Sequence, residues 1–164
     1  MTYRLHILNK NEKEVIQSLL RKQFGGKITI PGMLVKRGAE RIFLFQGSLD
    51  EKQIRNLEDW TQIERVGLYF AKIFQDKQGK EHIRLSIEGS QILGNQITEN
   101  IFELDDELAQ KWMQGEELNI KTGKKGFLLM KHKNDFLGTG KASEEKIGNF
   151  IPKSRRLKSK SIIN

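Results

Sequence analysis

The feature that most restricts the fold of this chain is the close spacing of short apolar segments after residue 100. Residues 100–104 read as a strand, and Asp105 or Asp106 begins a helix that Gly115 ends. Short strand candidates then follow with turns between them, at 118–121, 127–131, 136–140 and 147–151. One helix among many short strands, within about 65 residues, predicts a small, partly closed β barrel.

The first half of the chain mixes helices with strand pairs. An apolar stripe at helical spacing ends at Phe24, with Asn11 as the expected N-cap. Ser48 and Glu51 have the spacing of a capping box, which predicts a second helix up to about Trp60. A third, shorter helix is expected over 86–93. Strands are expected at 3–8, 27–30, 33–35, 41–45, 66–74 and 82–85.

These patterns predict an α+β protein in two parts. Residues 1–94 would form a small N-terminal α/β domain, and residues 95–164 a compact domain that contains the β barrel. The sequence shows no flexible linker between them.

The positive charge lies at one end of the chain. The net charge is +8, yet residues 119–164 hold twelve Lys/Arg against three Asp/Glu, a balance of +9. The preceding 118 residues therefore carry 17 basic and 18 acidic side chains. Such asymmetry is typical of a surface that binds a polyanion, although a merely solubilising basic tail is the alternative.

Several classes of protein are disfavoured by what the sequence lacks. It has no cysteine, so it has no disulfide and no thiolate nucleophile. His6, His82 and His132 are isolated in sequence, so we expect no metal site and no cofactor. No stretch of eighteen apolar residues and no apolar signal core occurs, so we expect a cytoplasmic protein that does not contact a membrane.

The second half resembles a known RNA-binding family. Residues 102–107 and 109–118 resemble the opening of a PUA domain, and 136–141 with 148–157 are more specific. They resemble the PUA-like tail of the Fmu/Sun-type rRNA cytosine-5 methyltransferases and their short stand-alone archaeal relatives. Residues 65–70 and 84–89 resemble segments that precede that tail. The resemblance implies a PUA-like β pseudo-barrel that binds structured rRNA or tRNA.

PUA proteins commonly contact the RNA backbone through the first helix, the glycine turn after it and a late strand. The resemblance therefore implies a contact at Gly115, although the acidic turn at Glu116 and Glu117 is unfavourable for RNA there. We place the main contacts in a basic strip, whose side chains supply phosphate-binding cations. Its members are Lys131, Lys133, Lys141, Lys146, Lys153, Arg155 and Arg156.

Two alternatives concern individual side chains of this half. Arg155 and Arg156 would fork onto phosphate oxygens, or else pair with acids of the first half. Trp60, Trp112 and Phe150 are candidates for base stacking, but the helical spacing of Trp112 favours a place in the core.

The sequence predicts no catalytic residue. The methyltransferases with a similar tail attack cytosine through a cysteine and bind the methyl donor in a large α/β domain, neither of which occurs here. Residues 138–143 depart from a phosphate-binding loop at both ends of the motif. An unfamiliar hydrolase would need clustered acids with perturbed pKa values.

We therefore predict a non-catalytic RNA-binding protein that acts in ribosome biogenesis or in rRNA or tRNA modification. Its main partner would be RNA. An RNA-modification enzyme or a pre-ribosomal particle would be a second partner. The alternative is a protein-interaction accessory subunit of an RNA-modification complex, in which the basic tail is incidental.

Overall fold

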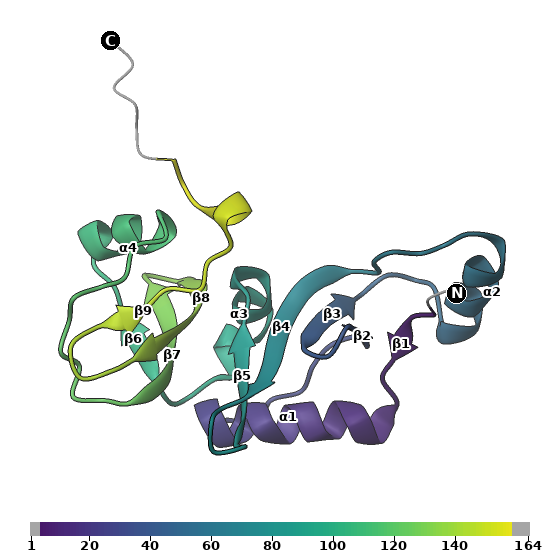
Figure 1. The fold of residues 1–164 in the computed structure, drawn as a ribbon, viewed down its shortest axis with the longest axis horizontal. Coiled ribbons are helices and arrows are strands. Elements are labelled where there is room, and N and C mark those ends of the chain that lie inside the picture. The colour runs from purple at the N-terminus through teal and green to yellow at the C-terminus, as the bar shows by residue number, and fades with distance from the viewer. Residues whose placement is uncertain (1–3, 159–164) are drawn as a thin grey trace, which may run out of the picture.

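The computed structural model describes residues 4–158. They form an α+β protein with one antiparallel sheet, one mixed sheet and four α-helices (Figure 1). Lys160, the last cation of the basic C-terminal region, lies outside the described residues. Among the described residues, no helix is both long and apolar enough to cross a membrane.

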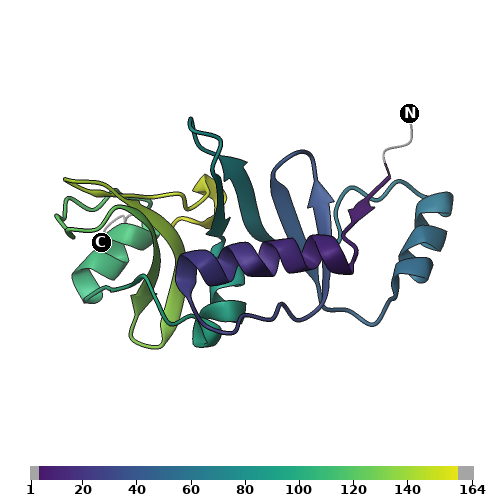
Figure 2. The same ribbon diagram turned by 90° about the horizontal axis from the view of Figure 1, so that it is seen from below.

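The first sheet has five strands in the order β1-β2-β3-β4-β5, and every neighbouring pair is antiparallel. Helix α1 lies along one face, as Figure 2 shows, and helix α2 lies beyond β1 at one end. The short helix α3 follows β5. The bounds are β1 (His6–Ile7), α1 (Lys10–Phe24), β2 (Met33–Arg37), β3 (Arg41–Phe45), α2 (Glu51–Trp60), β4 (Leu68–Gln75), β5 (Glu81–Leu85) and α3 (Ile87–Leu93).

The second sheet has four strands in the order β6-β7-β8-β9, with β6 parallel to β7 and the other pairs antiparallel. A short 3-10 turn, η1, precedes it, and a second one, η2, follows it. The bounds are η1 (Gly94–Gln96), β6 (Ile101–Glu103), α4 (Asp106–Met113), β7 (Gly126–His132), β8 (Asp135–Ala142), β9 (Ile147–Gly148) and η2 (Lys153–Arg155).

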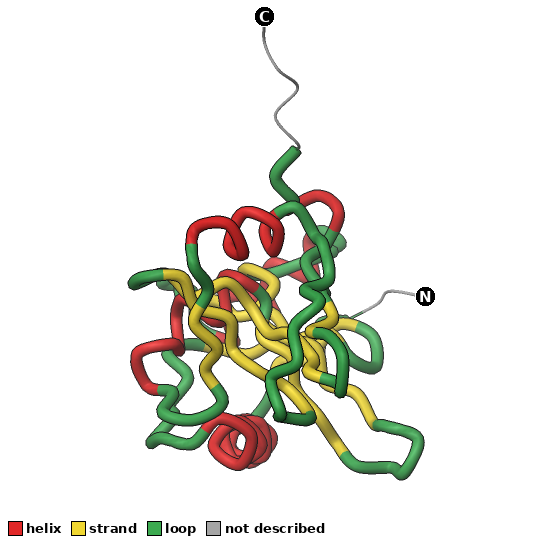
Figure 3. The backbone as a smooth tube through the Cα atoms, turned by 90° about the vertical axis from the view of Figure 1, so that its left-hand side faces the viewer, coloured by secondary structure: helices red, strands yellow, loops and turns green. Residues whose placement is uncertain are grey.

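The largest hydrophobic cluster runs through both sheets. It joins Leu20 and Phe24 of α1 to Phe70 of β4 and to Leu129 and Phe136 of the second sheet. In Figure 3, α1 is seen end-on beneath the strands. The core is therefore continuous across residue 95, where the sequence predicts a domain boundary; that boundary stays a prediction.

Two smaller clusters complete the core. One lies on the opposite face of the first sheet and contains Val35, Phe43 and Ile54 of α2. The other fills the second sheet around Trp112, which is fully buried and donates its ring N–H to the Leu137 carbonyl oxygen at 2.8 Å. The core position expected for Trp112 is confirmed.

Two buried side chains tie the sheets together. The Thr139 Oγ1 of β8 accepts the backbone N–H of Leu85 at 3.0 Å, and the Ser90 Oγ of α3 accepts that of Gly138 at 2.9 Å. Thr139 and Ser90 are almost fully buried. These bonds fix β8 against the end of β5, so the groove between the two sheets has defined walls.

The structure corrects three local predictions in the first half of the chain. The N-cap of α1 is Asn9, because Glu12 stands at its N3 position and completes a capping box, so Asn11 lies inside the helix. The N-cap of α2 is Asp50 for the same reason, with Gln53 at N3 in place of the expected Ser48 and Glu51. Residues 27–30 form no strand.

Residues 27–30 nevertheless belong to the core. Ile28 and Ile30 are buried, so the apolar pattern was read correctly as inward-facing. Side-chain amides take the place of a neighbouring strand, because the N–H of Thr29 donates to Gln96 and that of Ile30 donates to Gln17. A segment whose backbone groups are satisfied in this way has no need of a strand partner.

Candidate nucleic-acid interface

Much of the predicted basic strip is paired with carboxylates of the second half. The Lys131 Nζ lies 3.8 Å from Glu103, and the Lys133 Nζ lies 3.2 Å from Asp106. The Lys146 Nζ donates to Glu117 at 2.6 Å, in the acidic turn that follows α4. These pairs are largely exposed, so they contribute little to stability, but they lower the net charge of the strip.

Arg155 pairs with Glu88 of α3, as the alternative reading of the sequence expected. Arg156 has a different role. Its Nε donates to the Ile151 carbonyl oxygen at 3.0 Å, and its side chain lies directly over Gly115.

Gly115 is required by the packing of Arg156. Its φ is +87°, and a Cβ there would lie 2.3 Å from the Arg156 Nε. The next residue, Leu157, donates its N–H to the Met113 carbonyl oxygen at 2.8 Å. Gly115 and Arg156 thus hold the C-terminal segment against the end of α4. The sequence alone does not predict this contact between the glycine turn and the second arginine of the pair.

Two cations of the strip stand apart from the others. Among residues 4–158, no carboxylate oxygen comes within 4.0 Å of the Nζ of Lys141 or Lys153. Lys153 lies beside a groove that separates the two sheets, and Lys141 lies two residues along β8 from Thr139, which lines that groove. The Lys141 Nζ is 5.8 Å from the Phe127 ring centroid, and Lys153 precedes Ser154, which lines the groove.

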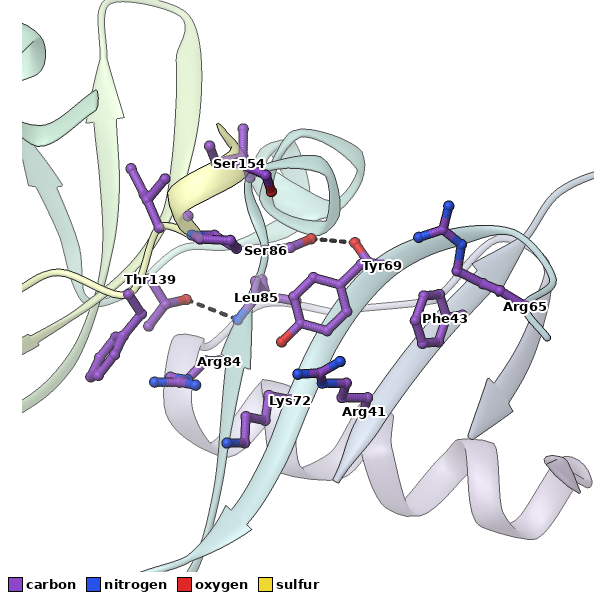
Figure 4. A pocket seen from close by; sticks show the side chains of 15 residues that line it. Arg41, Phe43, Arg65, Tyr69, Lys72, Arg84, Leu85, Ser86, Thr139 and Ser154 are labelled. Atoms are coloured by element: carbon purple, nitrogen blue, oxygen red, sulfur yellow. Dashed lines mark hydrogen bonds between the residues drawn. The ribbon is translucent and has the colours of Figure 1, made fainter. Parts of the chain in front are cut away.

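This groove was missed by sequence reasoning. It encloses a cavity of about 380 Å³ between one face of the first sheet and the segment after β9 (Figure 4). No aspartate or glutamate lines it. Its lining combines the cations Arg41, Arg65, Lys72 and Arg84 with the aromatic rings of Phe43, Tyr69 and Phe150.

Three of these cations form a row across neighbouring strands. Arg41 of β3 is the register partner of Lys72 of β4, and Lys72 is the partner of Arg84 of β5. Like charges that face each other across strands destabilise a sheet. Only Lys72 has a carboxylate partner among the described residues, Glu40 at 2.8 Å, so the row keeps a net positive charge.

A β-bulge brings an aromatic ring to the same face as this row. The register of β3 and β4 passes from Ala71 directly to Tyr69, which leaves Phe70 as an extra residue. Without the bulge, Tyr69 and Lys72 would point to opposite faces of the sheet, because side chains alternate along a strand. Figure 4 shows Arg41, Lys72 and Arg84 at the end of the cavity to which the Tyr69 hydroxyl points, with Arg65 at the other end.

The guanidinium of Arg84 is held between two aromatic rings. Its central carbon lies 4.0 Å from the centroid of Phe150 and 5.5 Å from that of Phe74. Burial lowers the pKa of Arg84 from its ordinary value, while the field of Tyr69 and then of Glu40 acts in the opposite direction. The charge is therefore partly desolvated and has no carboxylate oxygen within 4.0 Å among the described residues, so a bound anion would stabilise it.

The same rings connect this row to Lys141. Phe74 packs edge-on against Phe127, with ring centroids 5.6 Å apart, and the Lys141 ammonium lies over Phe127. Of the predicted strip, Lys153 thus lies beside the groove, and Lys141 is connected to Arg84 of the groove through Phe127 and Phe74. No sequence signal marks the groove itself, because Arg41, Lys72 and Arg84 are far apart in the chain and only strand pairing brings them together.

The histidines each contact one acid. The His82 Nε2 lies 2.8 Å from Asp76, and the His132 Nε2 lies 2.7 Å from Asp106. The hydrogen bond to His132 contributes most to lowering the pKa of Asp106, followed by that to Lys133. Within residues 4–158, no group of three or more His, Asp or Glu side chains is arranged to hold a metal ion.

Comparison with known families identifies the second half. Residues 99–157 match the family described as "Methyltransferase RsmF PUA domain". The predicted resemblance to the PUA-like tail of the Fmu/Sun-type methyltransferases is confirmed, and a PUA domain suggests RNA binding in general. No curated protein matches the chain.

Proposed function

We propose that this protein is a non-catalytic RNA-binding protein that recognises structured rRNA or tRNA, in ribosome biogenesis or in RNA modification. In this proposal, residues 95–164 act as a PUA-like pseudo-barrel, and the groove beside it is part of the RNA-binding face. The observation that carries the proposal is the row of Arg41, Lys72 and Arg84 next to the segment that matches a PUA domain.

The proposed mechanism is electrostatic docking of the phosphate backbone. Six cations would make the contacts and release counterions from the RNA: Arg41, Arg65, Lys72, Arg84, Lys141 and Lys153. The ion-paired cations of the predicted strip, such as Lys131 and Lys133, would contribute less, because a phosphate must first displace their carboxylates. Lys72 would likewise have to leave Glu40, and it does so in this proposal because Arg41 and Arg84 flank it in the row. Arg155 would exchange Glu88 for a phosphate in the same way.

The absence of catalysis is part of the proposal. The sequence has no cysteine, which the methyltransferases with a similar PUA domain use as their nucleophile. The basic groove is lined by cations, aromatic rings, hydroxyls and apolar groups, with no carboxylate to serve as a general base. A binding role fits these residues better than a chemical one.

A salt titration tests the proposal. With about six phosphate contacts, the logarithm of the affinity for a tRNA or rRNA fragment should fall with log salt at a slope of about −4 if the contacted RNA is single-stranded. The triple substitution Arg41→Ala, Lys72→Ala and Arg84→Ala should reduce the magnitude of that slope by about 2. Lys52→Ala is the matched control, because Lys52 is an exposed cation of α2. A slope near zero for the unaltered protein contradicts the proposal.

The accessory-subunit alternative rests on a different surface. Leu49, Leu57 and Trp60 at helix α2 are exposed large apolar side chains, and Trp60 is 89% exposed. Exposed apolar groups of this size suit a protein contact. Under this alternative, the triple substitution in the row should leave RNA affinity unchanged, while Trp60→Ser should weaken binding to a candidate modification enzyme.

A further inference from the structure

We propose that the groove between the two sheets receives a single unpaired nucleotide of the bound RNA, with little regard to the identity of its base. This inference rests on the proposed function, because it names the part of the RNA that this groove holds. Four features of the structure support it: the size of the cavity, the position of its cations, the exposed aromatic rings and the bonding state of its polar groups.

The cavity has the size and the polarity of a nucleotide site. Its volume of about 380 Å³ is within the range of about 300–1,000 Å³ that is typical of small-molecule sites. Arg65 lies at one end and the row of Arg41, Lys72 and Arg84 at the other, as Figure 4 shows. A nucleotide within an RNA chain has a phosphate on each side, so a cavity with cations at both ends matches its charge distribution.

Arg84 is prepared to bind one of these phosphates. The rings of Phe150 and Phe74 hold its guanidinium at centroid distances of 4.0 and 5.5 Å, so little freedom remains to be lost on binding. A planar guanidinium offers parallel N–H donors that fit two oxygens of a phosphate. Arg84 makes no charge pair with a carboxylate among the described residues, so those donors are available.

The aromatic rings favour an unpaired base over a paired one. Phe150 lines the groove and is 38% exposed, with Arg84 over one face of its ring, and the half-buried ring of Tyr69 lines the groove as well. A base can lie against such a ring only when it has left the helical stack, as the bases of loops and bulges do. A duplex would present its backbone to the surface cations but could not place a base between the sheet and the segment after β9.

Several polar groups of the inner wall are already hydrogen-bonded within the protein. The Thr139 Oγ1 accepts the Leu85 N–H, and the Ser86 Oγ donates to the Tyr69 carbonyl oxygen. The backbone N–H of Gly138 donates to Ser90. The Ser86 O–H and the Gly138 N–H are therefore not free to read the edge of a base. The hydroxyls of Tyr69 and Ser154 also line the groove, but a hydroxyl can both donate and accept, so it suits the edges of different bases. Stacking likewise works with every base. The groove should therefore accept all four nucleotides.

Fluorescence anisotropy with matched hairpin RNAs tests this inference. The probes are one hairpin with a single-nucleotide bulge, the same hairpin fully paired, and the same bulge without its base. At constant salt we expect the bulged hairpin to bind most tightly and the loss of the base to weaken binding by about 5- to 150-fold. Exchanging the bulged base among A, C, G and U should change the affinity less than about 3-fold.

Two substitutions connect this preference to the groove. Phe150→Leu keeps apolar bulk but removes the ring face, and it should abolish the difference between the bulged and the abasic hairpin. Arg84→Lys keeps the charge but removes the planar donor pair, so the bulge preference should fall while the salt slope is retained. Lys52→Ala should change neither quantity. The melting temperature of each variant shows whether it is folded, and the base-exchange series tests the inference without any variant.

The outcomes separate the inference from the proposed function. Equal binding of the bulged, paired and abasic hairpins, with a steep salt dependence, overturns the inference and leaves the proposed function standing. If the unaltered protein binds none of the hairpins, both the inference and the proposed function are overturned. Displacement of the bulged hairpin by a polyglutamate peptide at an equal concentration of negative charge indicates an acidic protein segment as the occupant and also overturns the inference.

Discussion

The hydrogen bond between Thr139 and Leu85 gives the sharpest test of how the two sheets are held together. Thr139→Val replaces the hydroxyl with a methyl group of nearly the same size, so no cavity forms and only the bond is lost. Thr139 and Leu85 are each 3% exposed, so the Leu85 N–H loses its acceptor in a largely buried position. An unsatisfied buried N–H costs about 1–3 kcal/mol. For a protein of this size, each kcal/mol lowers the melting temperature by about 2–4 °C.

Calorimetry and urea unfolding measure this loss. The two tryptophans are useful probes, because Trp112 is buried in the second half and Trp60 is exposed at α2 in the first. Since one hydrophobic cluster spans both sheets, we expect a single transition that shifts down by about 2–12 °C in the variant. Thr61→Val, at an exposed position, is the control. An unchanged melting temperature, or two separate transitions in the unaltered protein, would refute the reasoning.

Three further predictions follow from particular contacts. Glu58 accepts the Leu5 N–H at 2.6 Å and pairs with Arg55; burial raises its pKa, but these bonds outweigh burial and the net pKa is lowered. A carboxylate whose pKa is lowered in the folded state stabilises the protein above the unfolded pKa of about 4.3, and this stabilisation is lost as the pH falls through the folded pKa. The stability deficit of Glu58→Gln should therefore be largest near neutral pH and shrink below about pH 4. Urea unfolding at several pH values measures it. Gly115→Ala should displace Arg156 and speed tryptic cleavage after it, whereas Gly123→Ala, in an open turn, should not. Gly89→Ala should destabilise the protein by about 1–3 kcal/mol in thermal unfolding, because its Cβ would meet the Phe70 carbonyl oxygen at 2.2 Å, and an unchanged stability would contradict that packing.

The apolar patterns of the sequence predicted most of the fold, because burial depends on local periodicity. The stripe that ends at Phe24 became the buried face of α1, and the turn-separated segments after residue 125 became β7 and β8. Errors arose where two neighbouring residues were equally suitable. Asn9 and Asn11 are both good N-caps, and only the reciprocal bond with Glu12 decides between them.

The strand predicted over residues 118–121 illustrates a second kind of error. Only Leu118 pairs with another strand, through an isolated bridge to Ile147. The apolar character of the segment was real, since Leu118 is buried, but the extent of pairing depends on what the rest of the chain places beside it. Long-range pairing of this kind has no local signal in a single sequence.

The candidate site was harder to predict than the fold. The charge count located cations correctly in the second half but could not show which of them have acidic neighbours, such as Glu103 beside Lys131. The row of Arg41, Lys72 and Arg84 depends on the register of three strands, and the place of Tyr69 beside it depends on one bulge. These residues lie in the half of the chain with no net positive charge, so composition directed attention away from them.

Photo-crosslinking is the most direct measurement of where RNA lies on this protein. A hairpin with 4-thiouridine in a single-nucleotide bulge would be irradiated in complex with the full chain, and the attached peptides identified by mass spectrometry. We predict crosslinks in the peptides that contain Tyr69 and Phe150, on the two walls of the groove. Crosslinks confined to helix α1 or helix α2, with none in those two peptides, would contradict the account.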